Sequence, residues 1–170
     1  MTRSAARLFS VLALALPLAL TSCGGGSTDP KALTDEGQTA LKSAAYEDAA
    51  AKFQAALDAM GGDATNPNYA RARMGHVQAT LRTDAAAAKD EFLAYAKANP
   101  SSVTPDDFSQ IGRDFASAKK FSEAIDILDA GMKMHAESPV LVKLAKLIQS
   151  EAEKAGDSAA LGKMAGLGYI

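Results

Sequence analysis

Three glycines recur along this chain at nearly equal intervals, and this recurrence constrains the fold more than any other feature of the sequence. Gly37, Gly75 and Gly112 are separated by 38 and 37 residues. A glycine inside a helix costs about 1 kcal/mol relative to alanine, so regularly spaced glycines predict sites where helices pack closely. A second pattern of small and large residues recurs downstream of each glycine, at intervals of 36 to 39 residues: Ala49, Phe53 and Ala56; Ala88 and Phe92; Ala124, Leu128 and Gly131.

Composition favours helices over sheet. Alanine occupies 37 of the 170 positions, and aromatic residues make up only 6% of the chain. Alanine loses no side-chain entropy in a helix and fills the core of a sheet poorly. With 48% hydrophobic residues, the chain is expected to form one folded domain. Basic residues (18) do not outnumber acidic ones (20), so nucleic acid is not an expected partner.

Local signals at the segment ends predict eight helices. Thr104-Pro105-Asp106-Asp107 is the clearest start, with a capping hydroxyl, a proline in the first turn and acids near the positive end of the helix dipole. Ser138-Pro139 is expected to repeat this start, and Asp29-Pro30 and Asn66-Pro67 are weaker versions. The predicted helices span residues 30–44, 47–60, 67–82, 84–98, 105–118, 121–136, 139–155 and 158–166, which is an all-α fold.

The repeated pattern resembles the tetratricopeptide repeat. That family places large, large, small and aromatic residues on the first helix of a hairpin, and an aromatic, a small, a large and a small residue on the second. The third copy fills all eight positions with Phe108, Ile111, Gly112, Phe115, Phe121, Ala124, Leu128 and Gly131. The first copy fits through Leu33, Gly37, Tyr46, Ala49, Phe53 and Ala56.

Two copies depart from the family pattern. In the first, Glu36 stands where an apolar residue is usual; in the middle copy, Gly75 is one residue out of phase with Ala88 and Phe92, and Arg71 takes the aromatic position. The period also exceeds the family's length of about 34 residues. The resemblance covers about residues 31–136, with a weaker continuation. It implies a right-handed solenoid of about three and a half to four hairpins over residues 31–170, closed by a short C-terminal capping helix.

The segment from Val140 to Ile148 has apolar residues on most sides and only a narrow polar stripe at Lys143, Lys146 and Gln149. A helix with so broad an apolar face is covered from two sides. The favoured cover is the preceding helix together with the terminal helix at 158–166. A dimer or partner surface is the alternative, less favoured because a large exposed apolar patch promotes aggregation.

The N-terminus has the features of a lipoprotein signal peptide. Arg3 and Arg7 precede the uncharged apolar run from Leu8 to Leu20, which is too short for a permanent transmembrane helix. Leu20-Thr21-Ser22-Cys23 resembles the lipobox of bacterial lipoproteins, which implies lipid on Cys23. An incidental cysteine is the alternative. The favoured division is a signal peptide at 1–22, a flexible tether at 23–30 and the repeat domain at 31–170. Gly24, which follows the cysteine, permits sorting to the outer membrane in preference to the inner one.

Few residues suggest chemistry. The two histidines, His76 and His135, are 59 residues apart, and Cys23 is the only cysteine, so neither a metal site nor a cofactor is predicted. The sequence contains no glycine-rich phosphate loop or nucleophile elbow. Asp90-Glu91 is expected to form a solvated helix face. The chain is therefore predicted not to be an enzyme.

Proteins with this repeat hold a peptide or a helix on the concave face lined by the first helix of each hairpin. For this chain, the resemblance implies partner-binding candidates at Gln38, Leu41, Lys42, Tyr69, Arg73, His76, Thr80, Ser109, Arg113 and Ala116. Four of them would give the groove a positive character suited to acidic segments or a terminal carboxylate: Lys42, Arg73, His76 and Arg113. Ordinary solvated positions on amphipathic helices are the alternative interpretation of any single residue.

Two classes of function follow. The preferred one is a non-enzymatic adaptor that binds a partner protein or peptide on the extracytoplasmic side of a bacterial membrane, as several tetratricopeptide lipoproteins do in envelope assembly. The alternative is a cell-wall or envelope enzyme, or a small-ligand receptor, with a pocket between hairpins. A deep apolar pocket with converging acids would favour the alternative. An open groove lined by Tyr69, His76 and Arg113 would favour the adaptor.

Overall fold

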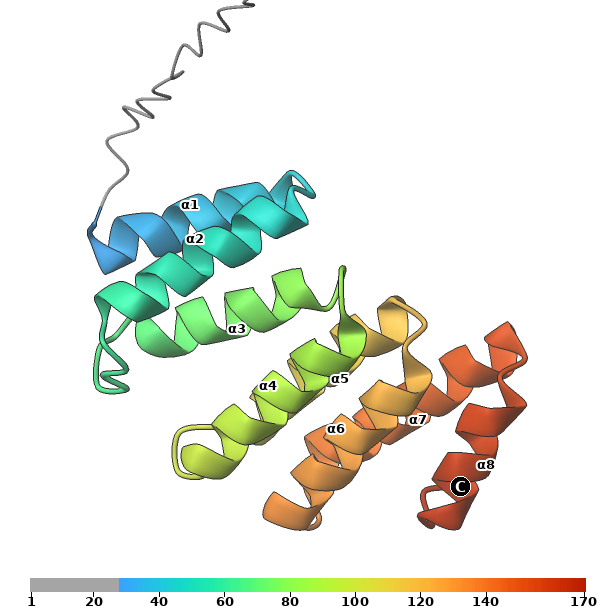
Figure 1. The fold of residues 1–170 in the computed structure, drawn as a ribbon. Coiled ribbons are helices and arrows are strands. Elements are labelled where there is room, and N and C mark those ends of the chain that lie inside the picture. The colour runs from blue at the N-terminus through green and yellow to red at the C-terminus, as the bar shows by residue number, and fades with distance from the viewer. Residues whose placement is uncertain (1–27) are drawn as a thin grey trace, which may run out of the picture.

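The computed structural model describes residues 28–170, and within this range the secondary structure is entirely helical (Figure 1). Every predicted helix is confirmed, with each boundary within two residues of its expected position. Cys23 and the proposed signal peptide lie outside the described residues. The helices are α1 (Pro30–Lys42), α2 (Tyr46–Ala59), α3 (Tyr69–Thr80), α4 (Ala85–Ala98), α5 (Pro105–Ser117), α6 (Phe121–Met134), α7 (Pro139–Ala155) and α8 (Ser158–Gly166).

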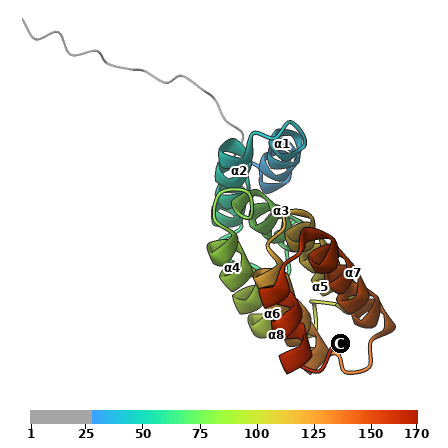
Figure 2. The same ribbon diagram turned by 90° about the vertical axis from the view of Figure 1, so that its right-hand side faces the viewer.

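The helices form two layers. Figure 2 shows the odd-numbered helices on one side of the molecule and the even-numbered helices on the other. In the odd layer α1 packs on α3, α3 on α5 and α5 on α7; in the even layer α4 packs on α6 and α6 on α8. Among the helices of residues 28–170, none has both the length and the apolar content needed to cross a membrane.

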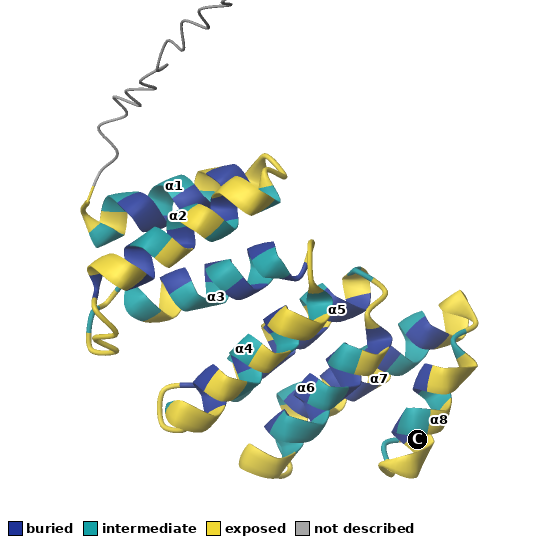
Figure 3. Cartoon of the chain, in the orientation of Figure 1, coloured by how far each residue is buried: buried dark blue, intermediate teal, exposed yellow. Residues whose placement is uncertain are grey.

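The buried apolar residues between the layers form two separate cores. Figure 3 shows the buried stretches of the helices in dark blue. The first core joins α1, α2 and α3 and consists of Leu33, Ala40, Ala49, Phe53, Ala56, Leu57, Met60, Ala72 and Ala79. The second core joins α4 to α8 and is built on larger side chains, among them Phe92, Phe108, Ile111, Phe115, Ile125, Leu128, Leu144 and Ile148. Of the buried residues on α3 and at its C-cap, Val77 and Leu81 belong to the second core, and the partly buried Tyr69 and Met74 also pack against it.

The recurring glycines are sites of close packing, as their spacing predicts, but they serve different interfaces. Gly37 on α1 and Gly75 on α3 both lie against one residue, Phe53 of α2, so a Cβ at either position would collide with its ring. Gly112 on α5 instead packs on Leu144 of α7, where a Cβ would lie 2.7 Å from Cδ2. Gly75 therefore faces the preceding hairpin, whereas Gly112 faces the following one. Equal spacing in the sequence does not place the glycines at equivalent interfaces.

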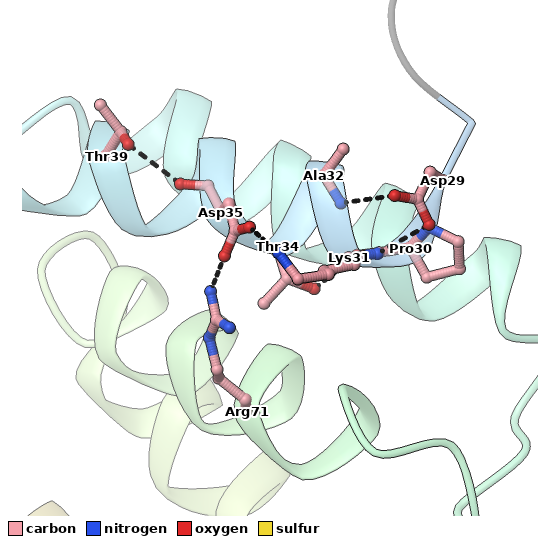
Figure 4. Close-up of polar contacts among 8 residues, drawn as sticks. All are labelled: Asp29, Pro30, Lys31, Ala32, Thr34, Asp35, Thr39 and Arg71. Carbon is pink, nitrogen blue, oxygen red and sulfur yellow. Dashed lines mark hydrogen bonds and ion pairs between the residues drawn. The ribbon is translucent and has the colours of Figure 1, made fainter.

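Side-chain capping explains the starts of four of the eight described helices, α1, α4, α5 and α8. Thr104 and Asp107 form a complete capping box, with the Asp107 amide donating to Thr104 Oγ1 at 3.3 Å and the Thr104 amide donating to Asp107 Oδ2 at 2.8 Å. Asp29 is a stronger cap than predicted, because its carboxylate accepts from the amides of both Lys31 and Ala32 (Figure 4). The expectation for Ser138 is wrong: its side chain makes no capping bond to the described residues.

The apolar face of α7 is covered from within the chain by α5, α6 and α8. Leu141, Leu144 and Ile148 are fully buried, whereas Val142 on the outer side remains 42% exposed. The prediction of cover by α6 and α8 is confirmed, with α5 as an additional neighbour. After α8, the Tyr169 hydroxyl donates to Asp129 Oδ1 on α6 at 3.1 Å, so the C-terminal residues fold back onto the second core.

Candidate functional site

The odd layer presents a polar outer surface that spans α1, α3 and α5, here called the open face and defined by Gln38, Arg71, Met74, Gln78, Asp107 and Gln110. These side chains, with Ala70 and Gly75, line a shallow hollow of about 300 Å³. Each of the three helices contributes one glutamine. On α3, the members lie at i, i+3 and i+7, a spacing that places them along one side of a helix.

Ion pairs and hydrogen bonds connect the helices along this face. The guanidinium of Arg71 on α3 pairs with Asp35 on α1, whose other oxygen accepts from Lys31 Nζ at 2.8 Å (Figure 4). Hydrogen bonds from Lys31 and then from Arg71 lower the pKa of Asp35. Gln78 Nε2 on α3 donates to Asp114 Oδ2 on α5 at 2.8 Å. Burial raises the pKa of Asp114 despite this hydrogen bond.

A second polar site lies between α3 and α4, here called the Arg73 cluster and made of Tyr69, Arg73, His76, Glu91 and Tyr95. Arg73 Nη1 donates to Glu91 Oε1 at 3.0 Å, and His76 Nδ1 lies 2.8 Å from Glu91 Oε2. Arg73 Nη2 donates to the Tyr69 hydroxyl at 3.1 Å. The rings of Tyr69 and Tyr95 are 6.2 Å apart, and both border an open hollow of about 260 Å³.

Hydrogen bonding holds Arg73 and Glu91 of the Arg73 cluster in their charged forms. Burial alone would raise the pKa of Glu91, but the hydrogen bonds from His76 and Arg73 outweigh it and lower that pKa. Burial also opposes the charge on Arg73, whereas its bonds to Tyr69 and Glu91 raise the pKa of the guanidinium. The buried Nε of Arg73 finds no hydrogen-bond partner among the described residues. An unsatisfied buried donor costs about 1–3 kcal/mol, so this interface is less than optimally packed.

The expectation that Asp90 and Glu91 form a solvated face is wrong for Glu91. The Asp90 side chain is 73% exposed, but that of Glu91 is only 19% exposed because it faces α3. The sequence does contain a signal for this. Glu91 lies three residues after Ala88 and four before Tyr95, in the periodicity of the buried side of α4.

The partner-binding candidates predicted from the sequence separate into several environments. Gln38 lines the open face, and Ser109 and Arg113 line an adjoining hollow on α5. Lys42 is exposed at the end of α1, and Thr80 is half-buried at the end of α3. The remaining candidates do not share this surface: Tyr69, Arg73 and His76 belong to the Arg73 cluster, Ala116 is buried, and Leu41 packs on the first core.

The observed open face therefore differs from the predicted positive groove both in its charge and in the residues that line it. Glu91 pairs with Arg73 and contacts His76, so the charge of Arg73 is compensated within the Arg73 cluster. Sequence reasoning missed Met74, Gln78 and Gln110, and treated Arg71 only as a departure from the repeat pattern. The occurrence of one glutamine in the first helix of each of three hairpins was the available signal.

Within residues 28–170, no group of three or more His, Cys, Asp or Glu side chains is placed to hold a metal ion. Comparison of the chain with protein-family models, with curated proteins and with solved structures finds no match.

Proposed function

We propose that this chain is a non-enzymatic adaptor, a tetratricopeptide-like domain that binds a partner protein or peptide on its open face. The alternation of successive helices between two layers supports this repeat architecture. In this proposal the hairpins α1/α2, α3/α4, α5/α6 and α7/α8 form a right-handed solenoid, and α8 acts as its C-terminal cap.

The three glutamines of the open face carry the proposal. Gln38, Gln78 and Gln110 come from three successive helices of one layer and line the same hollow. A side-chain amide both donates and accepts hydrogen bonds, as a peptide bond does, so a row of amides suits a polypeptide main chain. Arg71 and Asp107 add one charge of each sign, and the flexible thioether of Met74 adapts to apolar side chains of different shapes.

The proposed location is the extracytoplasmic face of a bacterial membrane, with the outer membrane preferred. Support comes from the charged start, the apolar run and the lipobox-like Leu20-Thr21-Ser22-Cys23. Lipid on Cys23 would leave seven residues before α1 begins at Pro30. Incorporation of labelled palmitate into the wild type but not into Cys23→Ala tests this part.

The binding proposal is tested by site-specific photo-crosslinking in cells that produce the full chain. A photoreactive residue at Gln110 on the open face is compared with one at Gln54, an exposed position on α2 in the other layer. We expect discrete crosslinked products at Gln110 that are absent at Gln54. The products should be lost when Gln38→Ala and Gln78→Ala are combined, because the partner's main chain loses two of its three amide contacts.

A double variant with the same chemistry outside the open face serves as the control. Gln54→Ala with Gln149→Ala removes two amides whose bonds are local, to Asp58 and Glu153. Products at Gln110 should survive this control at wild-type yield. Equal loss in both double variants, or the same products from Gln54, would contradict binding at the open face.

A further inference from the structure

We infer that the molecule has a hinge between α3 and α4, that the Arg73 cluster holds this hinge closed, and that bending there changes the width of the open face. The hinge itself follows from packing. Only the statement that a bound partner fixes the hinge angle rests on the proposed function.

The division of the apolar residues defines two bodies. The first body is α1, α2 and α3, whose buried side chains enclose Phe53. The second body is α4 to α8, joined by a continuous core that runs from Ala88 to Met164. On α3, Ala72 and Ala79 belong to the first core, while Val77 and the neighbouring Leu81 are the buried side chains given to the second. The apolar contact between the bodies is therefore small compared with the contact inside each body.

Polar side chains, together with the partly buried Tyr69 and Met74, fill the rest of the interface. Small residues bring α1, α2 and α3 close together, but on the side of α3 that faces α4 the corresponding positions hold Tyr69, Arg73 and His76. The bonds of Arg73 and His76 to Glu91 are half-buried, and Arg73 Nε has no partner within residues 28–170. Polar groups recover hydrogen bonds from water when an interface opens, whereas apolar groups lose their contacts outright. Opening therefore costs less here than within either body, and relative motion is expected at such small, polar interfaces.

The open face crosses this hinge. Gln38, Arg71 and Gln78 belong to the first body, and Asp107 and Gln110 to the second, yet all five line one hollow. The described hydrogen bonds across this side of the hinge include Gln78 to Asp114 at 2.8 Å. A change of angle between the bodies moves the two halves of the hollow relative to each other. A polypeptide bound along all three helices would select one angle and hold it.

Distances between spin labels test the hinge in the full chain without any partner. Cys23→Ser removes the native thiol, and labels are attached at exposed positions through Ala51→Cys on α2, Lys97→Cys on α4 and Lys146→Cys on α7. The pair at residues 51 and 146 reports across the hinge, and the pair at 97 and 146 reports within the second body. We expect a broader distance distribution for the first pair than for the second.

Glu91→Gln and Arg73→Met each break the Arg73 cluster from a different side. Both should shift the distance between positions 51 and 146 by more than about 2 Å, the scale of a domain rearrangement, and leave the pair at 97 and 146 unchanged. Asp90→Asn is the matched control, because it removes a carboxylate from the adjacent, exposed position and should change neither distance.

The distance between positions 97 and 146 also reports whether the second body remains folded. A variant that unfolds is recognised by this distance, and the other variant then tests the hinge. Equal widths for the two pairs, with no shift in either Glu91→Gln or Arg73→Met, would overturn the hinge. Failure to find a partner at the open face would contradict the proposed function but would leave these distances, measured on the free protein, unaffected.

Discussion

The two cores of this molecule are built from the same kind of helix but in opposite ways. Five of the nine buried residues of the first core are alanine, and Phe53, which contacts Gly37 and Gly75, is the one aromatic residue among these nine. In the second core, alanine accounts for seven of the 23 buried residues, and Phe92, Phe108, Phe115 and Phe121 share the interior. A core of small residues brings backbones close but concentrates its apolar contact in one side chain. A core of large residues distributes that contact.

The largest expected effect is therefore the loss of Phe53. Phe53→Ala should reduce the free energy of unfolding of the first body by about 3–5 kcal/mol, because alanine, glycine and their close backbones cannot collapse onto the cavity. Hydrogen exchange should show loss of protection in α1, α2 and α3, with α5 to α7 still protected.

Phe115→Ala in the second core completes this comparison. It creates a cavity of similar kind, but Phe92 and Phe108 remain in the same core. Protection should fall in α5 to α7 and persist in α1 and α2, the reverse of the pattern for Phe53→Ala. Uniform loss of protection along the chain in both variants would show that the two cores unfold as one unit.

The glycines provide the next test. Gly75→Ala should destabilise the protein by about 1–3 kcal/mol, because the added methyl collides with the Phe53 ring, which also lies against Gly37. Gly162→Ala on α8 is the control, since a Cβ there meets nothing within 4 Å. It should stabilise the protein by about 0.5–1 kcal/mol through helix propensity alone. Urea denaturation measures both, and a neutral Gly75→Ala would contradict the close packing around Phe53.

A third test concerns the interface between the cores. The pKa of Glu91 is lowered in the folded state, so its contribution to stability is complete above the unfolded-state pKa and is lost as pH falls through the folded-state value. Glu91→Gln should cost about 1–2 kcal/mol at pH 7 and progressively less towards pH 3. Urea midpoints measured across this pH range for the wild type and variant check the sign. A cost that does not change with pH would show that the carboxylate charge makes no contribution.

These differences mark the limit of what the sequence could predict. Helix ends depend on neighbouring residues, so a signal such as Thr104-Pro105 predicts them closely. The role of a glycine depends on which helix lies opposite it. Gly37 and Gly75 have equivalent spacing but contact Phe53 from different hairpins, and spacing alone contains no information about direction.

The orientation of α3 limited prediction of the candidate site for the same reason. Its sequence has polar residues on two sides, Arg71 and Gln78 on one and Arg73 and His76 on the other. The resemblance to the repeat family predicted that the second side binds a partner. In the fold, Glu91 of α4 faces that side and leaves the first side open. A single half-buried acid on the next helix, Glu91, therefore decides which side of α3 is covered, although the adjacent Asp90 is exposed.

The smallest expected effect tests the one described amide–carboxylate bond that links the bodies beneath the open face. Burial raises the pKa of Asp114, so its charged form costs stability at neutral pH, and the wild type regains this stability as pH falls through the raised value. Asp114→Asn retains an acceptor for Gln78 without the charge. It should raise the free energy of unfolding by up to about 1 kcal/mol at pH 7, and this gain should disappear towards pH 3. Asp114→Asn should therefore stabilise the interface between the two bodies, whereas Glu91→Gln should destabilise it. The opposite signs distinguish the contact of α3 with α5 from the contact of α3 with α4. Destabilisation by Asp114→Asn at neutral pH would mean that the carboxylate charge, through Arg82, stabilises the junction of the two cores.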